Sequence, residues 1–219
     1  MEYKEKRFEE DIESFLLSSG GYIKGNQATY NRDWAIDMPT LVTFMQATQP
    51  KEWERYVRNY KEEAEKKLYK RFNEEVEAHG LLHVLRNGIN DRGVKLRIAY
   101  FRPETTLNPD VVAKYEQNIL SCVRQFKYST ENENSIDMAL FLNGIPIVAI
   151  ELKNQITGQS IDNAKMQFMY DRNPRESCFQ FNRRFLVYFA VDLFEVAMTT
   201  QLKGKNTFFL PFNQQVIPT

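Results

Sequence analysis

Two consecutive apolar segments constrain the fold of this chain more than any other feature of its sequence. Residues 135–142 and 145–153 are each long enough for a strand and mostly apolar, with Asn143-Gly144 between them. An Asn-Gly pair between two such segments is the strongest short-range signal for a β-hairpin. The middle of the chain is therefore predicted to supply two neighbouring strands of a sheet.

Helical periodicity and further alternation surround this hairpin. Apolar residues recur at helical spacing in four segments, residues 8–16, 50–79, 109–120 and 160–170. Asn108 stands just before the third of these segments as a candidate N-cap. Alternating apolar residues predict three more strands, at residues 95–101, 185–191 and 195–198. The fold class expected from this pattern is α/β, with a mixed β-sheet flanked by helices.

Length and composition favour one domain in a reducing compartment. The 219 residues, 42% of them hydrophobic, suffice for one sizeable core, and no internal repeat or long linker divides residues 1–219. Cys122 and Cys178 form no CxxC pair, which argues against a disulfide scaffold or a cysteine-rich zinc module. No apolar run approaches the roughly 20 residues that cross a membrane. We expect a cytoplasmic protein without a membrane partner. Because residues 214–219 carry no capping signal, we also expect a cut from a longer chain.

The overall charge does not by itself indicate a nucleic-acid partner. Lysine plus arginine number 29, equal to aspartate plus glutamate, so the chain has no net positive field. From Lys153 onward the chain is more basic, with eight lysines and arginines against five acids. This modest excess suits contact with DNA phosphates beside an acidic site.

Three charged residues interrupt the apolar strands of the hairpin. Asp137 lies in the first strand, and Glu151 and Lys153 lie in the second, with thirteen residues between Asp137 and Glu151. Buried charge is costly unless it is paired or bound to a metal ion. A salt-bridged strand end explains a single acid of this kind. An Asp followed by Glu-x-Lys across a hairpin also has the spacing of a hydrolytic magnesium site.

The pairing register tests this interpretation. Around a two-residue turn, the numbers of paired residues sum to an odd total, so Asp137 and Glu151 would lie on opposite faces. We therefore expect either a three-residue loop of residues 143–145, which pairs Leu142 with Pro146, or a bulge. Asp137 would then lie opposite Glu151, with their Cβ atoms about 4.5–5.5 Å apart. The other face is expected to pack into the core and consists of Ile136, Met138, Leu140, Val148, Ile150 and Leu152.

Two carboxylates at that separation predict a bound cation. They cannot both ionise cheaply unless a positive charge lies between them. Mg²⁺ takes one or two carboxylates, here Asp137 and Glu151, together with a carbonyl such as that of Leu152 and water. Lys153 would orient the attacking water or stabilise the charge that develops on the phosphate. The predicted reaction is phosphodiester hydrolysis without a covalent intermediate.

Other candidate motifs are weaker. His79 and His83 lack the zincin pattern and are interpreted as surface or helix-end histidines. Gly204-Lys205 has no upstream glycine at the spacing of a P-loop, so ATP binding is not expected in this chain. Gln167 and Tyr170 are three residues apart on one helix face. They either reach the site or DNA, or merely complete the helix.

At this point the sequence resembles a known family. Residues 135–137, 140–146 and 151–154 resemble the nuclease core of the restriction (R) subunit of type I restriction-modification enzymes, a PD-(D/E)xK nuclease. Further blocks in family order cover nearly the whole chain, at residues 48–50, 79–80, 85–88, 100–103, 124–125, 128–129, 189–192, 198–200 and 209–213. The resemblance implies a restriction-endonuclease-like core, at the N-terminus of a longer polypeptide with two ATP-driven motor lobes.

The resemblance also implies residue roles and partners. Asp137, Glu151 and Lys153 match the catalytic motif. Glu10 matches a family acid on the first helix, with Glu9 and Glu13 as rivals. Tyr170 follows Gln167 by three residues, whereas many R subunits have Gln-x-x-x-Tyr. The implied partners are double-stranded DNA and the modification (methyltransferase) and specificity subunits. The alternative is a non-catalytic docking module that links the motor to the methyltransferase core.

Overall fold

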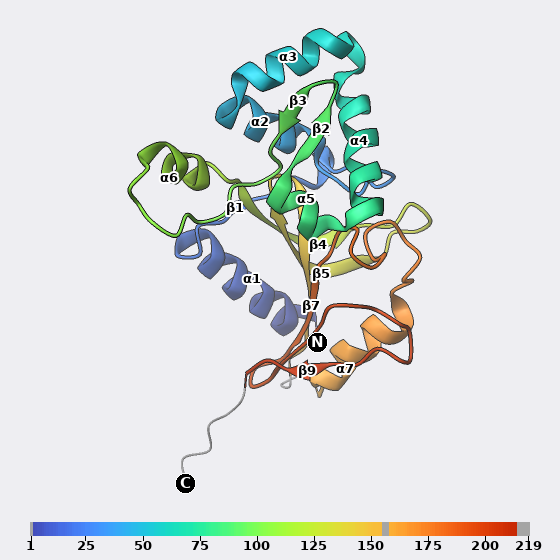
Figure 1. Cartoon of the computed structure of the whole chain (residues 1–219). Helices are drawn as coiled ribbons and strands as arrows, with labels where there is room; N and C mark the ends of the chain where they lie inside the picture. The colour runs from blue at the N-terminus through green and yellow to red at the C-terminus, as the bar shows by residue number, and fades with distance from the viewer. Residues whose placement is uncertain (1, 155–157, 214–219) are drawn as a thin grey trace.

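A mixed seven-stranded sheet lies at the centre of the computed structural model, which describes residues 2–154 and 158–213 (Figure 1). In spatial order the strands are β1 (Ile23–Lys24), β4 (Leu120–Lys127), β5 (Ser135–Leu142), β6 (Ile145–Leu152), β7 (Val187–Val191), β8 (Val196–Thr199) and β9 (Leu210–Pro211). β1 runs parallel to β4 and β6 runs parallel to β7, while the other neighbours are antiparallel. The predicted hairpin and the predicted pairing of β7 with β8 are both confirmed.

Helices cover both faces of this sheet, which confirms the predicted α/β class. On one face, α1 (Glu2–Ser18) packs Phe8 and Ile12 against a cluster that contains Met138 and Leu152. On the other face, α7 (Ile161–Met166) packs Ala164 against Ala190 of β7. A π-helical turn, Gln167–Asp171, continues α7. No helix among the described residues is both long and apolar enough to cross a bilayer.

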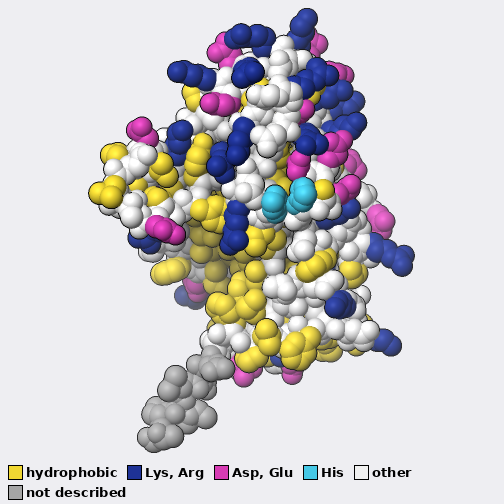
Figure 2. Space-filling model, viewed as in Figure 1, with side chains coloured by type: hydrophobic (Ala, Val, Ile, Leu, Met, Phe, Trp, Pro, Cys, Tyr) yellow, Lys and Arg dark blue, Asp and Glu magenta, His cyan; other side chains and the backbone are white. Residues whose placement is uncertain are grey.

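A second group of elements lies over one end of the sheet. It consists of α2 (Met38–Thr48), α3 (Pro50–Tyr60), α4 (Ala64–His79), α5 (Leu81–Asn87) and the hairpin of β2 (Ile89–Asp91) and β3 (Val94–Leu96). Their side chains share one core with Ile145 of β6, so they form a continuous structure with the sheet. Lys and Arg side chains are numerous on this part of the molecule (Figure 2). The remaining elements are α6 (Pro109–Glu116) and two 3₁₀ turns, Gln27–Thr29 and Lys61–Glu63.

The predicted single helix over residues 50–79 is wrong, because the chain breaks between α3 and α4. Lys61 has φ 52°, a left-handed conformation that no continuous α-helix contains. Tyr56 and Tyr60 of α3 both donate hydrogen bonds to the Asp91 carboxylate, at 2.9 and 2.8 Å. The break lets α3 and α4 each bury an apolar stripe against the β2–β3 hairpin. Packing therefore overrides a helical period that runs through the break.

Two more predicted boundaries are wrong for a related reason. The strand expected over residues 95–101 ends with β3 at Leu96, because side-chain amides then take over its backbone groups. The Gln49 amide accepts from Arg97 N at 2.8 Å and donates to Arg97 O at 2.7 Å. The helix expected over residues 109–120 begins at the predicted Asn108 cap but ends at Glu116, and β4 starts at Leu120. β4 was not predicted at all.

The hairpin turn has two residues, so the expected three-residue loop is wrong, but the alternative of a bulge is confirmed. Leu142 pairs with Ile145 across Asn143 and Gly144, whose φ angles of 51° and 82° suit a type I′ turn. The register then shifts, and Leu140 pairs with Val148. Pro146 lacks the N–H that would continue the ladder, which favours a bulge beside it. The extra residue brings Asp137 and Glu151 into opposite positions.

The face of the hairpin predicted to enter the core does so except at one position. Met138, Leu140 and Leu152 are buried in the α1 cluster, while Val148 and Ile150 pack against it partly buried. Ile136 instead joins the cluster on the other face of the sheet. The residue opposite Asp137 in β4, Gln125, has φ 47°, which interrupts the regular alternation at this point. The segment 214–219, where a cut from a longer chain is expected, lies outside the described residues.

Candidate active site

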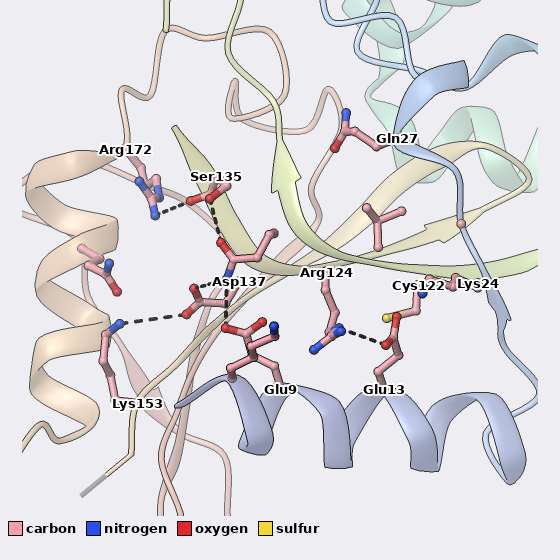
Figure 3. Close-up of a pocket in the computed structure, with 15 residues that line it drawn as sticks. Glu9, Glu13, Lys24, Gln27, Cys122, Arg124, Ser135, Asp137, Lys153 and Arg172 are labelled. Atoms are coloured by element: carbon pink, nitrogen blue, oxygen red, sulfur yellow. Dashed lines mark hydrogen bonds and ion pairs between the residues drawn. The ribbon is translucent and has the colours of Figure 1, made fainter. Parts of the chain in front are cut away.

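A pocket of about 750 Å³ opens beside the catalytic hairpin predicted from the sequence. Its lining includes side chains from α1, from the central strands and from the segment after β6: Glu9, Gln125, Asp137, Lys153, Gln167 and Arg172. Figure 3 shows Asp137 between Lys153 and Glu9, and it shows Arg172 next to Ser135. The pocket thus brings together residues from near the start of the chain and from its last third.

Asp137 lies where the ladder between β5 and β6 ends. The last pair joins Met138 to Ile150, and at the next position the Asp137 carboxylate accepts a hydrogen bond from Leu152 N at 2.8 Å. The same oxygen, Oδ2, lies 4.0 Å from Lys153 Nζ. The carboxylate therefore stands in for a backbone carbonyl, and this fixes it against the strand that carries Glu151 and Lys153.

Glu151 is fully buried beside this carboxylate. Arg172 donates two hydrogen bonds to its Oε1, from Nε at 2.8 Å and from Nη2 at 2.6 Å. Its other oxygen, Oε2, has no hydrogen-bond partner among the described residues. Burial, followed by the negative charge of Asp137, raises the pKa of Glu151 to about 8, while Arg172 and Lys153 oppose the shift. Ion pairing at a strand end accounts for Oε1 but leaves Oε2 unexplained.

Sequence reasoning missed Arg172, which the π-helical turn brings to the pocket. Hydrogen bonds in a π-helix link residues five apart, so Gln167 and Arg172 lie on one face of the turn, and both line the pocket. Arg172 also donates to Ser135 O at 2.8 Å. Tyr170 is 68% exposed and is not among the lining residues. Of the two readings left open, Gln167 reaches the site and Tyr170 does not. The spacing of three residues between Gln167 and Tyr170, instead of the four of many R subunits, was the signal in the sequence that Tyr170 would not reach the site.

Two acids of α1, Glu9 and Glu13, line the pocket, and Glu9 is the one that Gln125 links to Asp137. Gln125 Nε2 donates to Glu9 Oε1 at 2.9 Å and lies 3.4 Å from Asp137 Oδ1, so one amide links the two carboxylates. Glu10, the acid favoured by the family resemblance, has a side chain 47% exposed and lies 3.5 Å from Arg124 instead. Glu13 is buried but pairs with the same Arg124 at 2.9 Å. Nothing in the helical pattern distinguished these three acids.

Gln125 is the second residue that sequence reasoning missed. Its left-handed φ of 47° in the middle of β4 turns its side chain toward the pocket, where Ser135 Oγ donates to its Oε1 at 3.0 Å. A non-glycine residue in this region of φ is uncommon and is held there by its surroundings. Its position within a family block was the one signal available from the sequence.

The oxygen atoms of the pocket fit a hard divalent cation. Asp137 supplies a carboxylate in the pocket lining, and Glu151, which is fully buried and not among the lining residues, supplies a second one next to it. Glu151 Oε2 and Gln167 Oε1 are buried acceptors without a hydrogen-bond partner among the described residues. Within residues 2–154 and 158–213, no group of three or more His, Cys, Asp or Glu side chains is arranged to hold a metal. A metal here would therefore depend on two carboxylates, backbone carbonyl and water, which is how Mg²⁺ is usually held.

The two histidines lie away from this pocket. His79 ends α4, with a side chain 52% exposed and 3.7 Å from Glu75, and its ring centroid lies 4.8 Å from that of His83. This confirms their interpretation as surface or helix-end histidines.

Comparison with known protein families gives one match, which spans most of the chain. The family model described as Type I restriction enzyme R protein N terminus (HSDR_N) matches residues 3–207. A search of curated proteins finds no match.

Proposed function

Since the chain belongs to the family of type I restriction enzyme R protein N termini, we propose that it is a magnesium-dependent DNA endonuclease domain. The observation that carries this proposal is the fully buried Glu151, with one carboxylate oxygen held by Arg172 and the other without a partner among the described residues, beside Asp137. A buried charge so arranged is costly without a further cation. The family and the pocket chemistry both favour Mg²⁺ as that cation.

The residues of the pocket would divide the work as follows. Asp137 and Glu151 would hold the metal together with the backbone carbonyl of Leu152. When bound, the metal supplies positive charge that polarises a phosphoryl oxygen and lowers the pKa of a water. Lys153, within reach of Asp137, would orient the attacking water or stabilise charge on the phosphate. Arg172 would hold Glu151 in place, and Gln167 would add an acceptor oxygen.

The proposal extends to the complete R subunit. There the domain would cut unmodified foreign DNA after translocation by ATP-driven motor lobes, in a cytoplasmic complex with the modification and specificity subunits. ATP would bind only to the motor lobes. Double-stranded DNA would be the substrate of the pocket described above.

Asp137→Ala in the assembled complex tests the proposal. DNA cleavage should fall below detection, because the substitution removes a metal ligand and the acceptor for Leu152 N. ATP hydrolysis should stay at the parent rate, since the motor lobes are untouched. Cutting that survives this substitution with normal ATP hydrolysis would favour the non-catalytic docking module instead.

The neighbouring acids of α1 allow a sharper prediction about the accessory carboxylate. Glu9→Gln should reduce cleavage by about tenfold or more, because supporting groups around metal ligands typically contribute about 10–100-fold. Glu10→Gln is the matched control, one residue away on the same helix, and should leave cleavage within about twofold of the parent. Initial cleavage rates of the assembled complex at saturating Mg²⁺ and ATP would measure both. Equal effects of the two substitutions would contradict the assignment of Glu9.

A further inference from the structure

A second pocket, of about 470 Å³, lies between α3, the β2–β3 hairpin and α6 and shares no lining residue with the candidate active site. Five cationic side chains line it: Lys51, Arg55, Lys95, Arg97 and Lys114. Among the described residues, Glu52 is its one acidic lining residue. It belongs to the region where Figure 2 shows numerous Lys and Arg side chains.

These five cations differ from others on the same helices because none of them has an anionic partner among the residues that the structure describes. Elsewhere on α3 and α4, Arg58 pairs with Glu54 at 3.0 Å, and Lys67 pairs with Glu63 at 3.4 Å. Over the described part of the chain, no ion pair includes any of the five. Like charges that converge without partners repel one another, so this arrangement costs free energy in the unbound protein.

The N-terminus of α3 adds further positive potential to this pocket. The side chain of Gln49, at the N-cap position, makes no cap because both ends of its amide bind the backbone of Arg97. Free N–H groups and the helix dipole therefore favour an anion there. The first turn carries Glu52, which suits the helix dipole, but also Lys51, a cation at the wrong end of it. A bound anion would offset both costs.

We infer that this pocket binds phosphates of the duplex DNA backbone, at a site separate from the one that cuts. The choice of DNA rests on the proposed function, since a nuclease domain must hold a duplex. The alternative source of phosphate, a free nucleotide, needs an apolar slot for its base. Here Val94 is 3% exposed and Lys114 Nζ lies over the Tyr100 ring at 5.7 Å. A backbone contact needs only the charges, and carries no sequence preference.

The test compares two triple variants with the same change in net charge. The pocket variant combines Lys51→Gln, Arg55→Gln and Lys95→Gln. The control variant combines Arg58→Gln, Lys67→Gln and Lys70→Gln, which removes cations that are each paired with an acid on α3, α4 or the turn between them. Binding of the 219-residue chain to a fluorescent duplex of about 30 base pairs would be followed by anisotropy in EDTA, from low to high salt. Because EDTA prevents cleavage, the result does not depend on whether the chain is a nuclease.

The parent chain should bind weakly, with affinity that falls steeply as salt rises. In the pocket variant, the slope of log affinity against log salt should become shallower by about three, because each removed cation leaves one phosphate without its counter-charge. The control slope should change by less than about one, and a duplex of scrambled sequence should bind like the first. Equal slopes for the two variants, or a pocket variant that binds like the parent, would overturn the inference. So would inorganic triphosphate that binds the parent tightly, fails to bind the pocket variant and leaves duplex binding unchanged.

Discussion

Glu151→Gln should abolish DNA cleavage and yet make the metal-free domain more stable than the parent at alkaline pH. The side chain is fully buried, and its pKa is raised from an ordinary value near 4.5 to about 8. A carboxyl group with a raised pKa stabilises the folded state below its unfolded pKa, and this contribution is lost as pH rises through the folded pKa. The parent should therefore lose stability between about pH 4.5 and pH 8.

The size of this loss follows from the shift in pKa. One pKa unit corresponds to about 1.4 kcal/mol, so the rise from 4.5 to about 8 is worth on the order of 5 kcal/mol. Glutamine cannot ionise, and the free energy of unfolding of Glu151→Gln should stay nearly level over the same range. Urea unfolding in EDTA at several pH values would give the free energy of unfolding of the parent and of Glu151→Gln as a function of pH. Groups that titrate alike in both proteins do not contribute to the difference between these two curves.

Two controls connect this result to the site. Asp137→Asn removes the charge that raises the pKa of Glu151 most after burial, so its stability should fall less steeply with pH. Millimolar Mg²⁺ should restore stability to the parent at about pH 8 but not to Glu151→Gln, because a ligand stabilises only a protein that binds it. Parent stability that does not fall between about pH 5 and pH 8 would contradict the position assigned to Glu151.

Gly144→Ala should cost roughly 3–5 kcal/mol of folding free energy, from a left-handed conformation and a rigid overlap together. Gly144 has φ +82°, and a Cβ atom there would lie 2.2 Å from Asp37 O and 3.1 Å from Asp37 C. Both are backbone atoms, and Asp37 N donates to Gly144 O at 2.8 Å, so the two chains cannot separate cheaply. This contact connects the β5–β6 hairpin to the start of α2.

Gly21→Ala is the matched control for this substitution. Gly21 has φ +73°, but a Cβ atom there would meet nothing within 4 Å. Gly21→Ala should therefore cost only the free energy of placing alanine in a left-handed conformation, about 1–2 kcal/mol. Urea unfolding midpoints and slopes of both variants would separate the two contributions. Similar costs at the two glycines would show that the close approach to Asp37 does not constrain the turn.

The hairpin turn shows how far local signals reach. Asn143-Gly144 identified the turn. For Asp137 and Glu151 to lie on the same face of the hairpin, one extra residue was then required somewhere between them. The number of residues between the two acids does not show where the extra residue lies. In the structure it forms a bulge at Ile147 and not part of the turn. The position depends on what packs over the turn. Gly144 is held against Asp37, a residue more than a hundred positions earlier in the chain.

The residues of the predicted catalytic motif stand out in the sequence because charge inside an apolar strand is conspicuous. Asp137, Glu151 and Lys153 break a pattern that local composition alone establishes, and strand alternation places them relative to one another. Arg172, Gln125 and the choice of Glu9 over Glu10 could not be found this way. An arginine, a glutamine or a glutamate at the surface of a helix or strand is ordinary, and each becomes special only through a distant partner.

The sequence by itself determined the α/β class and the β5–β6 hairpin, and it singled out the three charged residues of that hairpin, since each depends on side chains that are neighbours along the chain. Tertiary structure decided the break at Lys61, the end of β3 and the membership of the pocket. In each case a residue distant in the sequence supplies a hydrogen-bond partner. The Asp91 carboxylate accepts from the α3 tyrosines, the Gln49 amide binds the Arg97 backbone, and Arg172 donates to Glu151. Contacts between residues distant in sequence outweigh the local preference because unpaired buried polar groups and unfilled core cost more than a broken helix or strand.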